Sequence, residues 1–355
     1  MFAIILGTRP EIIKMSPIIR ACETQGVDYF VLHTGQHYSY DMDRAFFEDL
    51  DLPEPGYNLN VGSGTHADQT GRIMTGVEKI LMKEKPEAVL VQGDTNTVLA
   101  GALVASKLHI KVGHVEAGLR SFDRQMPEEI NRVVTDHISD YLFSPTETAR
   151  QNLIKEGIRE EKIFVTGNTI VDAIQQNLEI AQKKASPLQK MCLTPQEYFL
   201  VTAHRAENVD VLERFKRILE GLSIIHNEFS FPVIFSMHPR TAKMLQTFNL
   251  SVNGIRVIKP LGYLDFLQLE SNARLVLTDS GGLQEEACIL GVPCVTLRDN
   301  TERPETLEVG ANVLAGADPD KMVNSVKNSL DSSLNWRNPF GDGCAGQRII
   351  KTLKL

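Results

Sequence analysis

Residues 87–115 read EAVLVQGDTNTVLAGALVASKLHIKVGHV and decide the fold class of this chain. The segment opens with an apolar run at 87–92, passes through a polar turn into a helical pattern at 98–108, and closes with a second apolar run at 111–115. Neither run alternates polar and apolar residues, so both are expected to be strands buried on both faces. Strand, helix and strand in this order predict a parallel pair joined by a right-handed crossover.

The same pattern extends through the whole chain. Further buried strands are expected at 2–6, 29–33, 140–143, 198–203, 232–237, 255–258, 274–278 and 293–297, with helices such as 10–23 and 68–83 between them. The two halves open alike, with FAIILGTRPE from residue 2 and YFLVTAHRAEN from residue 198, each a buried strand followed by a loop that carries an arginine. This organisation predicts an α/β protein of two doubly wound, parallel-sheet domains facing each other across a cleft.

The first half is expected to end near Gly167-Asn168, after its last strand, which gives domains of residues 1–168 and 169–339. The polar segment 183–195, with two prolines and no strand pattern, is interpreted as connecting structure.

The composition and net charge of the chain argue against several classes of binding partner. The chain has 355 residues, 42% of them hydrophobic and 23% charged, with a net charge of −8. Such an acidic surface repels nucleic acid and anionic lipid, and no apolar run approaches the roughly 20 residues that span a bilayer. The five cysteines are scattered without a C-x-x-C pair, which favours the cytoplasm and argues against a disulfide framework or a structural zinc.

Basic and glycine-rich loops follow several of the expected strands. Because ligands of open α/β sheets bind beyond the carboxyl ends of the strands, these loops are candidates for a diphosphate site. They carry Arg9, Lys14, His204, Arg205, Ser280, Gly281, Gly282, Arg298 and Arg303. Two other glycine patterns, at 62–67 and 341–346, cannot open a βαβ unit, because no buried strand precedes the first and only nine residues follow the second. The sequence therefore predicts a diphosphate ligand and no dinucleotide cofactor.

Three carboxylates of the first half lie at the same predicted edge. Asp94 follows the strand AVLV, Glu116 follows GHV, and Glu128 comes directly after Pro127. Each has a structural alternative: Asp94 as a helix N-cap, Glu116 as the ion-pair partner of Arg120, and Glu128 as a first-turn acid. Carboxylates beside a leaving phosphate are also what proton transfer at a carbon requires, which favours a catalytic role.

Nine motifs make the sequence recognisable. They are GTRPEIIK (7–14), QGDTNT (92–97), GHVEAGLRS (113–121), MPEEINR (126–132), FSPTETAR (143–150), VTGNTIVDA (165–173), TDSGGLQEEA (278–287), DNTERPE (299–305) and NPFGDG (338–343). In this order and spacing the chain strongly resembles the non-hydrolysing UDP-N-acetylglucosamine 2-epimerases. The resemblance implies the GT-B fold, with a C-terminal helix at 340–355 returning to the first domain. It also implies interconversion of UDP-GlcNAc and UDP-ManNAc without nicotinamide, in a homodimer. Because the sequence has no ligand cluster and no dinucleotide fingerprint, neither a metal nor another cofactor is expected.

The resemblance also implies roles for the residues that match the motifs. Asp94, Glu116, Glu128 and His204 correspond to the catalytic residues. Arg9 and Lys14, from the GTRPE-x-x-K string, correspond to substrate-binding residues. The diphosphate ligands correspond to Ser280, Gly281 and Gly282, the phosphate side to Arg303, and the ligand of the ribose hydroxyls to Glu286. His37, Gln69, Arg205 and His238 match the site where bacterial members bind a second, regulatory UDP-GlcNAc. The residues after His37, Tyr38-Ser39-Tyr40-Asp41-Met42, depart from the bacterial pattern.

Three other functions share the diphosphate site. They are a GT-B glycosyltransferase, a hydrolysing epimerase that releases ManNAc and UDP, and a nucleotide-sugar sensor without catalysis. A sensor needs no acid and a transferase needs one base, so the three matched acids favour the epimerase. The motifs do not assign which acid serves which face of the sugar carbon C2.

Overall fold

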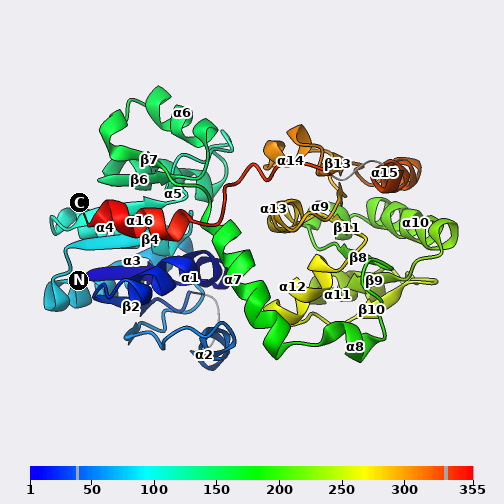
Figure 1. The fold of residues 1–355 in the computed structure, drawn as a ribbon, viewed down its shortest axis with the longest axis horizontal. Coiled ribbons are helices and arrows are strands. Elements are labelled where there is room, and N and C mark those ends of the chain that lie inside the picture. The colour runs from blue at the N-terminus through cyan, green and yellow to red at the C-terminus, as the bar shows by residue number, and fades with distance from the viewer. Residues whose placement is uncertain (37–39, 332–334, 355) are drawn as a thin grey trace. The chain divides into compact units, whose positions relative to one another are not determined.

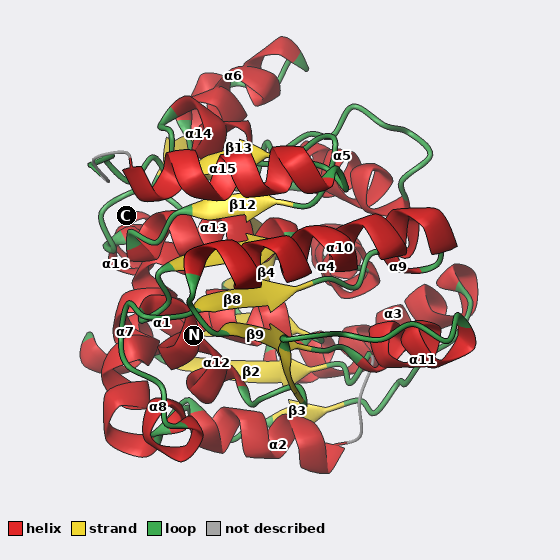
Figure 2. Ribbon diagram, turned by 90° about the vertical axis from the view of Figure 1, so that its right-hand side faces the viewer, coloured by secondary structure: helices red, strands yellow, loops and turns green. Residues whose placement is uncertain are grey.

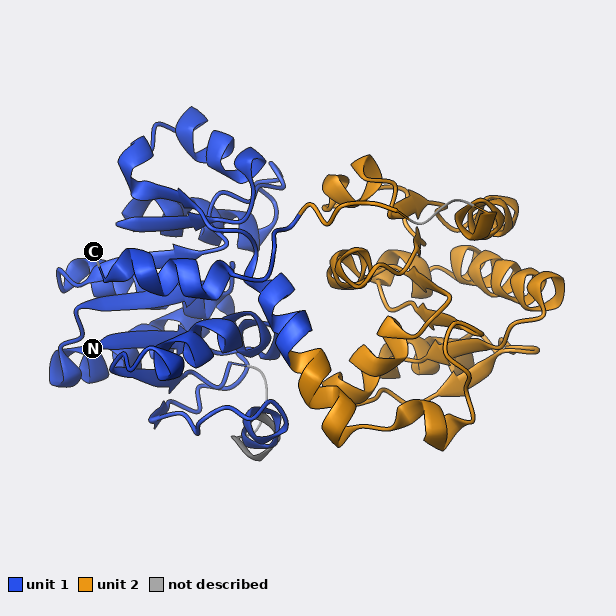
Figure 3. Ribbon diagram, in the orientation of Figure 1, with its two compact units in different colours: residues 1–176, 340–355 blue, residues 177–339 orange. Residues whose placement is uncertain are grey.

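The computed structural model describes residues 1–36, 40–331 and 335–354. The chain forms two compact units, coloured separately in Figure 3. The first unit comprises Met1–Gln176 and Phe340–Leu355, and the second comprises Asn177–Pro339. The division between them falls inside a helix, whereas the sequence analysis expected it at the end of the preceding strand.

The first unit is built on a seven-stranded sheet with the order β3-β2-β1-β4-β5-β6-β7 (Figure 1). All its strand pairs are parallel. The strands are β1 (Phe2–Leu6), β2 (Tyr29–His33), β3 (Tyr57–Asn58), β4 (Ala88–Gln92), β5 (Lys111–Val115), β6 (Tyr141–Ser144) and β7 (Ile163–Val165). Because β1 pairs with both β2 and β4, the direction of winding reverses between β1 and β4, which is where ligands of such sheets bind.

Helices connect these strands and return the chain to the next one. They are α1 (Arg9–Thr24), α2 (Tyr40–Asp49), α3 (His66–Glu84), α4 (Asn96–Lys107), α5 (Pro127–Ile138), α6 (Glu147–Lys155), the 3₁₀ turn η1 (Glu160–Lys162), α7 (Thr169–Lys184) and α16 (Ala345–Leu353). The C-terminal α16 packs closely on α1, since a Cβ atom added to Gly346 would lie 2.9 Å from the carbonyl oxygen of Pro17.

Burial explains why the strands lack polar alternation. Every residue of β1 and of β4 is buried, because helices cover both faces of the sheet. Gly113 of β5 shows how tight this packing is: a Cβ atom there would lie 2.6 Å from the side chain of Leu90 on β4. The apolar runs of the sequence are therefore the central strands of the core.

The second unit repeats the plan with a six-stranded parallel sheet of order β10-β9-β8-β11-β12-β13. Its strands are β8 (Phe199–Thr202), β9 (Val233–Ser236), β10 (Arg256–Ile258), β11 (Leu275–Thr278), β12 (Cys294–Thr296) and β13 (Asn312–Leu314). Its helices are α8 (Pro187–Met191), α9 (Ala206–Val209), α10 (Leu212–Phe229), α11 (Pro239–Thr247), α12 (Tyr263–Ser271), α13 (Gly281–Leu290), α14 (Pro304–Glu308) and α15 (Pro319–Asp331).

Helices flank the strands in this unit as well (Figure 2). Successive residues of β8 enter different apolar clusters: Phe199 and Val201 pack with α10 and α15, whereas Leu200 packs with residues of α12 and α13. The winding reverses between β8 and β11, which pair directly.

The ten expected strands are confirmed, each with ends within one residue of the prediction. The sequence analysis gave no bounds for β3, β7 and β13, which are edge strands of two or three residues. It anticipated β7 only as a last strand ending near Gly167-Asn168. It also missed α8, a five-residue helix inside the segment taken as a connection. Among the described residues, no helix combines the length and the apolar character needed to cross a membrane.

Candidate functional site

The first unit brings three predicted site residues to one edge of its sheet. Arg9 begins α1 just after β1, Asp94 lies in the loop after β4, and Glu116 directly follows β5. These three strands are neighbours and run parallel, so their carboxyl ends meet at the same edge, beside the reversal of winding.

Asp94 is held by an arginine and does not cap a helix. Thr95 caps α4 instead, since its hydroxyl accepts a hydrogen bond from the amide of Val98, so the N-cap alternative for Asp94 is wrong. An Asp94 carboxylate oxygen lies 2.6 Å from a guanidinium nitrogen of Arg132 on α5. Both side chains are partly accessible, at 31% and 18%, which leaves the carboxylate open to a ligand.

Glu116 is paired with Lys14. The lysine ammonium lies 2.7 Å from both carboxylate oxygens, and the side-chain amide of Gln92 also donates to one of them. The backbone of Glu116 has φ +71°, a left-handed conformation that is costly for a glutamate and is typical of functional sites. The alternative pairing with Arg120 is wrong, because Arg120 bonds Asp136 and Glu156.

Glu128 and Glu129 share the first turn of α5 but differ in environment. Glu128 is exposed, whereas Glu129 is buried and accepts hydrogen bonds from the backbone amides of Ser121 and Phe122. Burial alone would raise the pKa of Glu129, but these amides and Arg132 outweigh it and lower that pKa below its ordinary value. Because Arg132 contacts both Glu129 and Asp94, the buried glutamate positions the arginine that holds Asp94.

The sequence analysis missed Glu11, although it lies within the GTRPE motif. One carboxyl oxygen accepts from the amides of Gly7 (2.5 Å) and Thr8 (2.9 Å), and the other accepts from the Thr95 hydroxyl (2.5 Å). Complete burial raises the pKa of Glu11 to about 7. The side chain thus fastens the loop before Arg9 to the loop that carries Asp94.

Proline is favoured at the first position of a helix, which would make Pro10 the first residue of α1. The structure instead has Arg9 at the first position and Pro10 at the second.

The predicted regulatory residues are spread over both units. Gln69, on α3, is buried; its amide donates to the carbonyls of Gln36 and Gly62 and accepts from Asn96. His37 lies outside the described residues. His238 caps α11 through its ring nitrogen Nδ1, 3.2 Å from the amide of Arg240.

In the second unit, a buried aspartate organises the loop that carries His204. Asp279 follows β11 and is fully buried; its carboxylate accepts from the amides of His204 and Arg205 and from the side chain of Asn208. Burial lowers the pKa of His204, which keeps its imidazole neutral at pH 7. The rings of His204 and His238 lie 5.5 Å apart between centroids. The sequence analysis quoted Asp279 in its motif without giving it a role.

The glycine turn after β11 opens helix α13. Ser280 is the N-cap, and Gly281 and Gly282 are the first two helical residues, whose amides have no acceptor within a helix. A helix terminus of this kind attracts an anion. Glu302 lies close by, since a Cβ atom added to Gly281 would be 3.4 Å from its carboxylate, and Arg205 lies 3.9 Å from the same carboxylate.

The arginines and acids that follow β12 form a second cluster beside α13. Arg303 lies 3.4 Å from the buried Glu285 and donates to the backbone carbonyl of Glu302. Arg298 pairs with Glu207 and Glu302. Glu286, the predicted ribose ligand, is near Glu270 of α12. The pKa of Glu270 lies well above its ordinary value, mainly because the group is buried and also because the Glu286 carboxyl is close.

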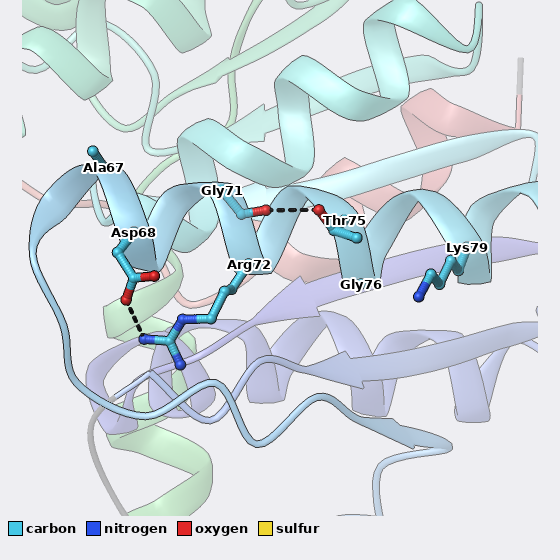
Figure 4. Close-up of a pocket in the computed structure, with 7 residues that line it drawn as sticks. All are labelled: Ala67, Asp68, Gly71, Arg72, Thr75, Gly76 and Lys79. Carbon is cyan, nitrogen blue, oxygen red and sulfur yellow. Dashed lines mark hydrogen bonds and ion pairs between the residues drawn. The ribbon is translucent and has the colours of Figure 1, made fainter.

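A shallow hollow on α3 does not coincide with these residues. It has a volume of about 550 Å³ and is lined by Ala67, Asp68, Gly71, Arg72, Thr75, Gly76 and Lys79, all from one helix (Figure 4). None of them was predicted as a site residue, and Asp68 and Arg72 form an ion pair with each other. Among the described residues, no three or more histidine, cysteine or acidic side chains are grouped so that they could hold a metal ion.

The chain is similar to one family of known proteins. A family model described as UDP-N-acetylglucosamine 2-epimerase matches residues 20–354. The UDP-N-acetylglucosamine 2-epimerase of Methanocaldococcus jannaschii is 62% identical, over 99% of this chain and 98% of the relative, and that of Methanococcus maripaludis is 59% identical, over 98% and 96%.

Solved structures confirm the GT-B fold class. The crystal structure of the Methanocaldococcus jannaschii UDP-GlcNAc 2-epimerase in complex with UDP-GlcNAc and UDP superposes with a TM-score of 0.87, at 61% identity and 99% coverage of both chains. The family model and these relatives extend over nearly the whole sequence. The chain therefore belongs to the UDP-N-acetylglucosamine 2-epimerase family.

Proposed function

We propose that this protein interconverts UDP-N-acetylglucosamine and UDP-N-acetylmannosamine by inverting the sugar at C2, without hydrolysing the nucleotide bond. The observation that carries the proposal is the placement of Asp94 and Glu116 after the adjacent strands β4 and β5, each with its own cation. Family membership supports the substrate class, since the relatives named above are UDP-GlcNAc 2-epimerases.

The chemistry accounts for the need for acids and cations together. No carbonyl adjoins the C2–H bond of the sugar, so a base cannot remove this proton through a simple enolate. Elimination is the feasible route: the base takes the C2 proton, the C1–O bond to UDP breaks with its electron pair leaving on the phosphate, and a C1–C2 double bond forms. Re-addition of UDP at C1, with a proton delivered to the opposite face of C2, completes the inversion.

The residues divide between these tasks. Asp94, Glu116 and Glu128 transfer protons, and Arg9, His204 and Arg303 stabilise the departing diphosphate. Lys14 contributes to substrate binding. The turn Ser280-Gly281-Gly282 binds the diphosphate through helix amides, and Glu286 accepts hydrogen bonds from the ribose. Each donor to the developing anion contributes about 3 kcal/mol to lowering the barrier. No step in this scheme requires a metal or nicotinamide.

Incubation with UDP-GlcNAc alone tests the proposal. Proton NMR of the mixture is expected to show UDP-ManNAc with the nucleotide bond intact. Free ManNAc with UDP would identify a hydrolysing epimerase, and turnover only with an added acceptor would identify a glycosyltransferase. Oxygen-18 placed in the bridge between C1 and the β-phosphate should move to non-bridging positions, because elimination breaks that C1–O bond.

Three further proposals concern the protein's setting. We place the protein in the cytoplasm, and the absence of disulfides among its cysteines supports this location. We also expect a homodimer, whose mass light scattering after gel filtration would measure. We also propose that a second UDP-GlcNAc, bound through some or all of the predicted regulatory residues His37, Gln69, Arg205 and His238, activates the enzyme. If added UDP-GlcNAc leaves the initial rate of UDP-ManNAc conversion unchanged, the regulatory role is wrong.

A further inference from the structure

His114 lies on β5, two residues before Glu116 at the sheet edge that carries the predicted acids. Its side chain is completely buried. The ring nitrogen Nδ1 lies 2.6 Å from a carboxylate oxygen of Asp136 on α5, and Nε2 lies 2.8 Å from the backbone carbonyl oxygen of Gly93. Both nitrogens therefore have a hydrogen-bond partner inside the fold.

The chemistry of the two partners determines the protonation of the ring. A backbone carbonyl only accepts hydrogen bonds, so Nε2 must carry a proton. The other oxygen of Asp136 accepts from the amide of Gly118 and lies 2.8 Å from Arg120, and both donors stabilise the carboxylate anion. An anionic Asp136 needs a donor at Nδ1 as well. Protons on both nitrogens make the ring an imidazolium.

The surrounding charges compensate this buried cation. Burial alone would lower the pKa of His114. The negative charge of Asp136 and the hydrogen bonds of the ring to Asp136 and Gly93 raise this pKa by more than burial lowers it, so the net shift is upward. Glu116, at the end of the same strand, adds to the rise. Arg120 pairs with Glu156 as well as with Asp136, so two cations face two anions within the network.

The contacts of His114 reach both acids through the backbone. Gly93 immediately precedes Asp94 and has φ +84°, and its amide also donates to the carbonyl of Val115 on β5. Both backbone groups of Gly93 therefore bond to β5: its amide bonds to the Val115 carbonyl, and its carbonyl bonds to the His114 ring. Glu116 follows two residues after His114 on that strand. The ring of His114 is therefore one of the contacts that set the position of Asp94 relative to Glu116, together with the Gly93 amide bond and the Arg132 ion pair.

We propose that Asp136 and Gly93 hold His114 as an imidazolium, and that His114 is a positioning residue that fixes the loop of Asp94 against the strand of Glu116. The second half of this statement rests on the proposed function, whereas the charge of the ring does not.

Nitrogen-15 NMR of the full chain, labelled at its nine histidines, tests the charge. The resonances of His114 are those missing from the spectrum of His114→Gln. At pH 8, both ring nitrogens should show the shifts of protonated nitrogens, while the Asp136→Asn variant should have lost one of those protons. An unprotonated ring nitrogen in the wild-type protein at pH 8 would overturn the assignment, whatever the protein catalyses.

Steady-state kinetics test the positioning. One glutamine amide cannot bond both Asp136 and Gly93, so His114→Gln should lower kcat for epimerisation about 10- to 100-fold with KM within about twofold, as misplacement of reacting groups does. His137→Gln, an exposed histidine on α5, is the matched control and should keep wild-type kinetics. Equal kcat in the two variants, or a change in KM alone, would overturn the positioning role. An inactive wild type would instead refute the proposed function and leave the NMR result standing.

Discussion

Glu11 gives the stability of the first unit a pH dependence that one substitution should remove. Its carboxyl group faces two backbone amides and one hydroxyl, and it is completely buried. Glu11→Gln keeps the same three partners, because the amide oxygen can accept from Gly7 and Thr8, and the amide nitrogen can donate to the Thr95 hydroxyl, which reverses the direction of that one bond. The variant therefore keeps the fold and loses only the titration.

The size of the effect follows from the two pKa values. Burial raises the pKa of Glu11 from 4.5 to about 7, so the folded state holds its proton more tightly than the unfolded state. Its contribution to stability is complete below pH 4.5 and is lost as the pH rises through 7. Between pH 5 and pH 8 the wild type should lose about 2.5 kcal/mol relative to Glu11→Gln.

Urea unfolding of both proteins at the two pH values measures this difference. Hydrogen exchange of amides in α1 should be the probe, so that the first unit is followed separately from the second. Glu11→Ala is the control: it leaves three donors without their acceptor and should be destabilised by about 3 kcal/mol at pH 8. A free-energy difference between wild type and Glu11→Gln that is the same at pH 5 and pH 8 would refute the assignment of a raised pKa.

Three further results are expected. Removing the charge of each predicted acid should lower kcat at least ~10²-fold, in the variants Asp94→Asn, Glu116→Gln and Glu128→Gln, while calorimetry should still detect UDP binding. Turnover near the wild-type rate in all three variants would show that these acids have structural roles only. Thorough chelation with EDTA should leave the rate unchanged, and the denatured protein should release no nicotinamide; lost activity after chelation would contradict the scheme. Asp279→Ala should destabilise the second unit by about 3 kcal/mol in urea unfolding, because three donors lose their acceptor, and an unchanged midpoint would contradict its role in holding the His204 loop.

The strands were predictable because local sequence determines them. A strand such as β4 is an unbroken apolar run, and helices covering both faces of a parallel sheet require such runs. The loops after β1, β4, β5, β8 and β11 were predictable for the same reason, since each begins where an apolar run ends. The edge strand β3 has only two residues, too few to produce a pattern.

The partners of the site residues could not be read from the sequence. Lys14 and Glu116 are 102 positions apart, and Arg132 and Asp94 are 38 apart, so only the folded sheet brings each pair together. Glu11 and His114 were missed for a related reason: each lies within a quoted motif, but its role depends on contacts with the loop after β4. The role of a buried polar residue follows from its partners, which the sequence does not name.

Deuterium uptake at C2 tests the central claim most directly. The protein is incubated with UDP-GlcNAc alone in D₂O, and the UDP-ManNAc formed is examined by NMR and mass spectrometry. If enzyme groups that exchange with solvent remove and return the C2 proton, the product carries one deuterium at C2, and Asp94→Asn slows its appearance together with turnover. UDP-ManNAc formed in D₂O with hydrogen retained at C2 would contradict the account.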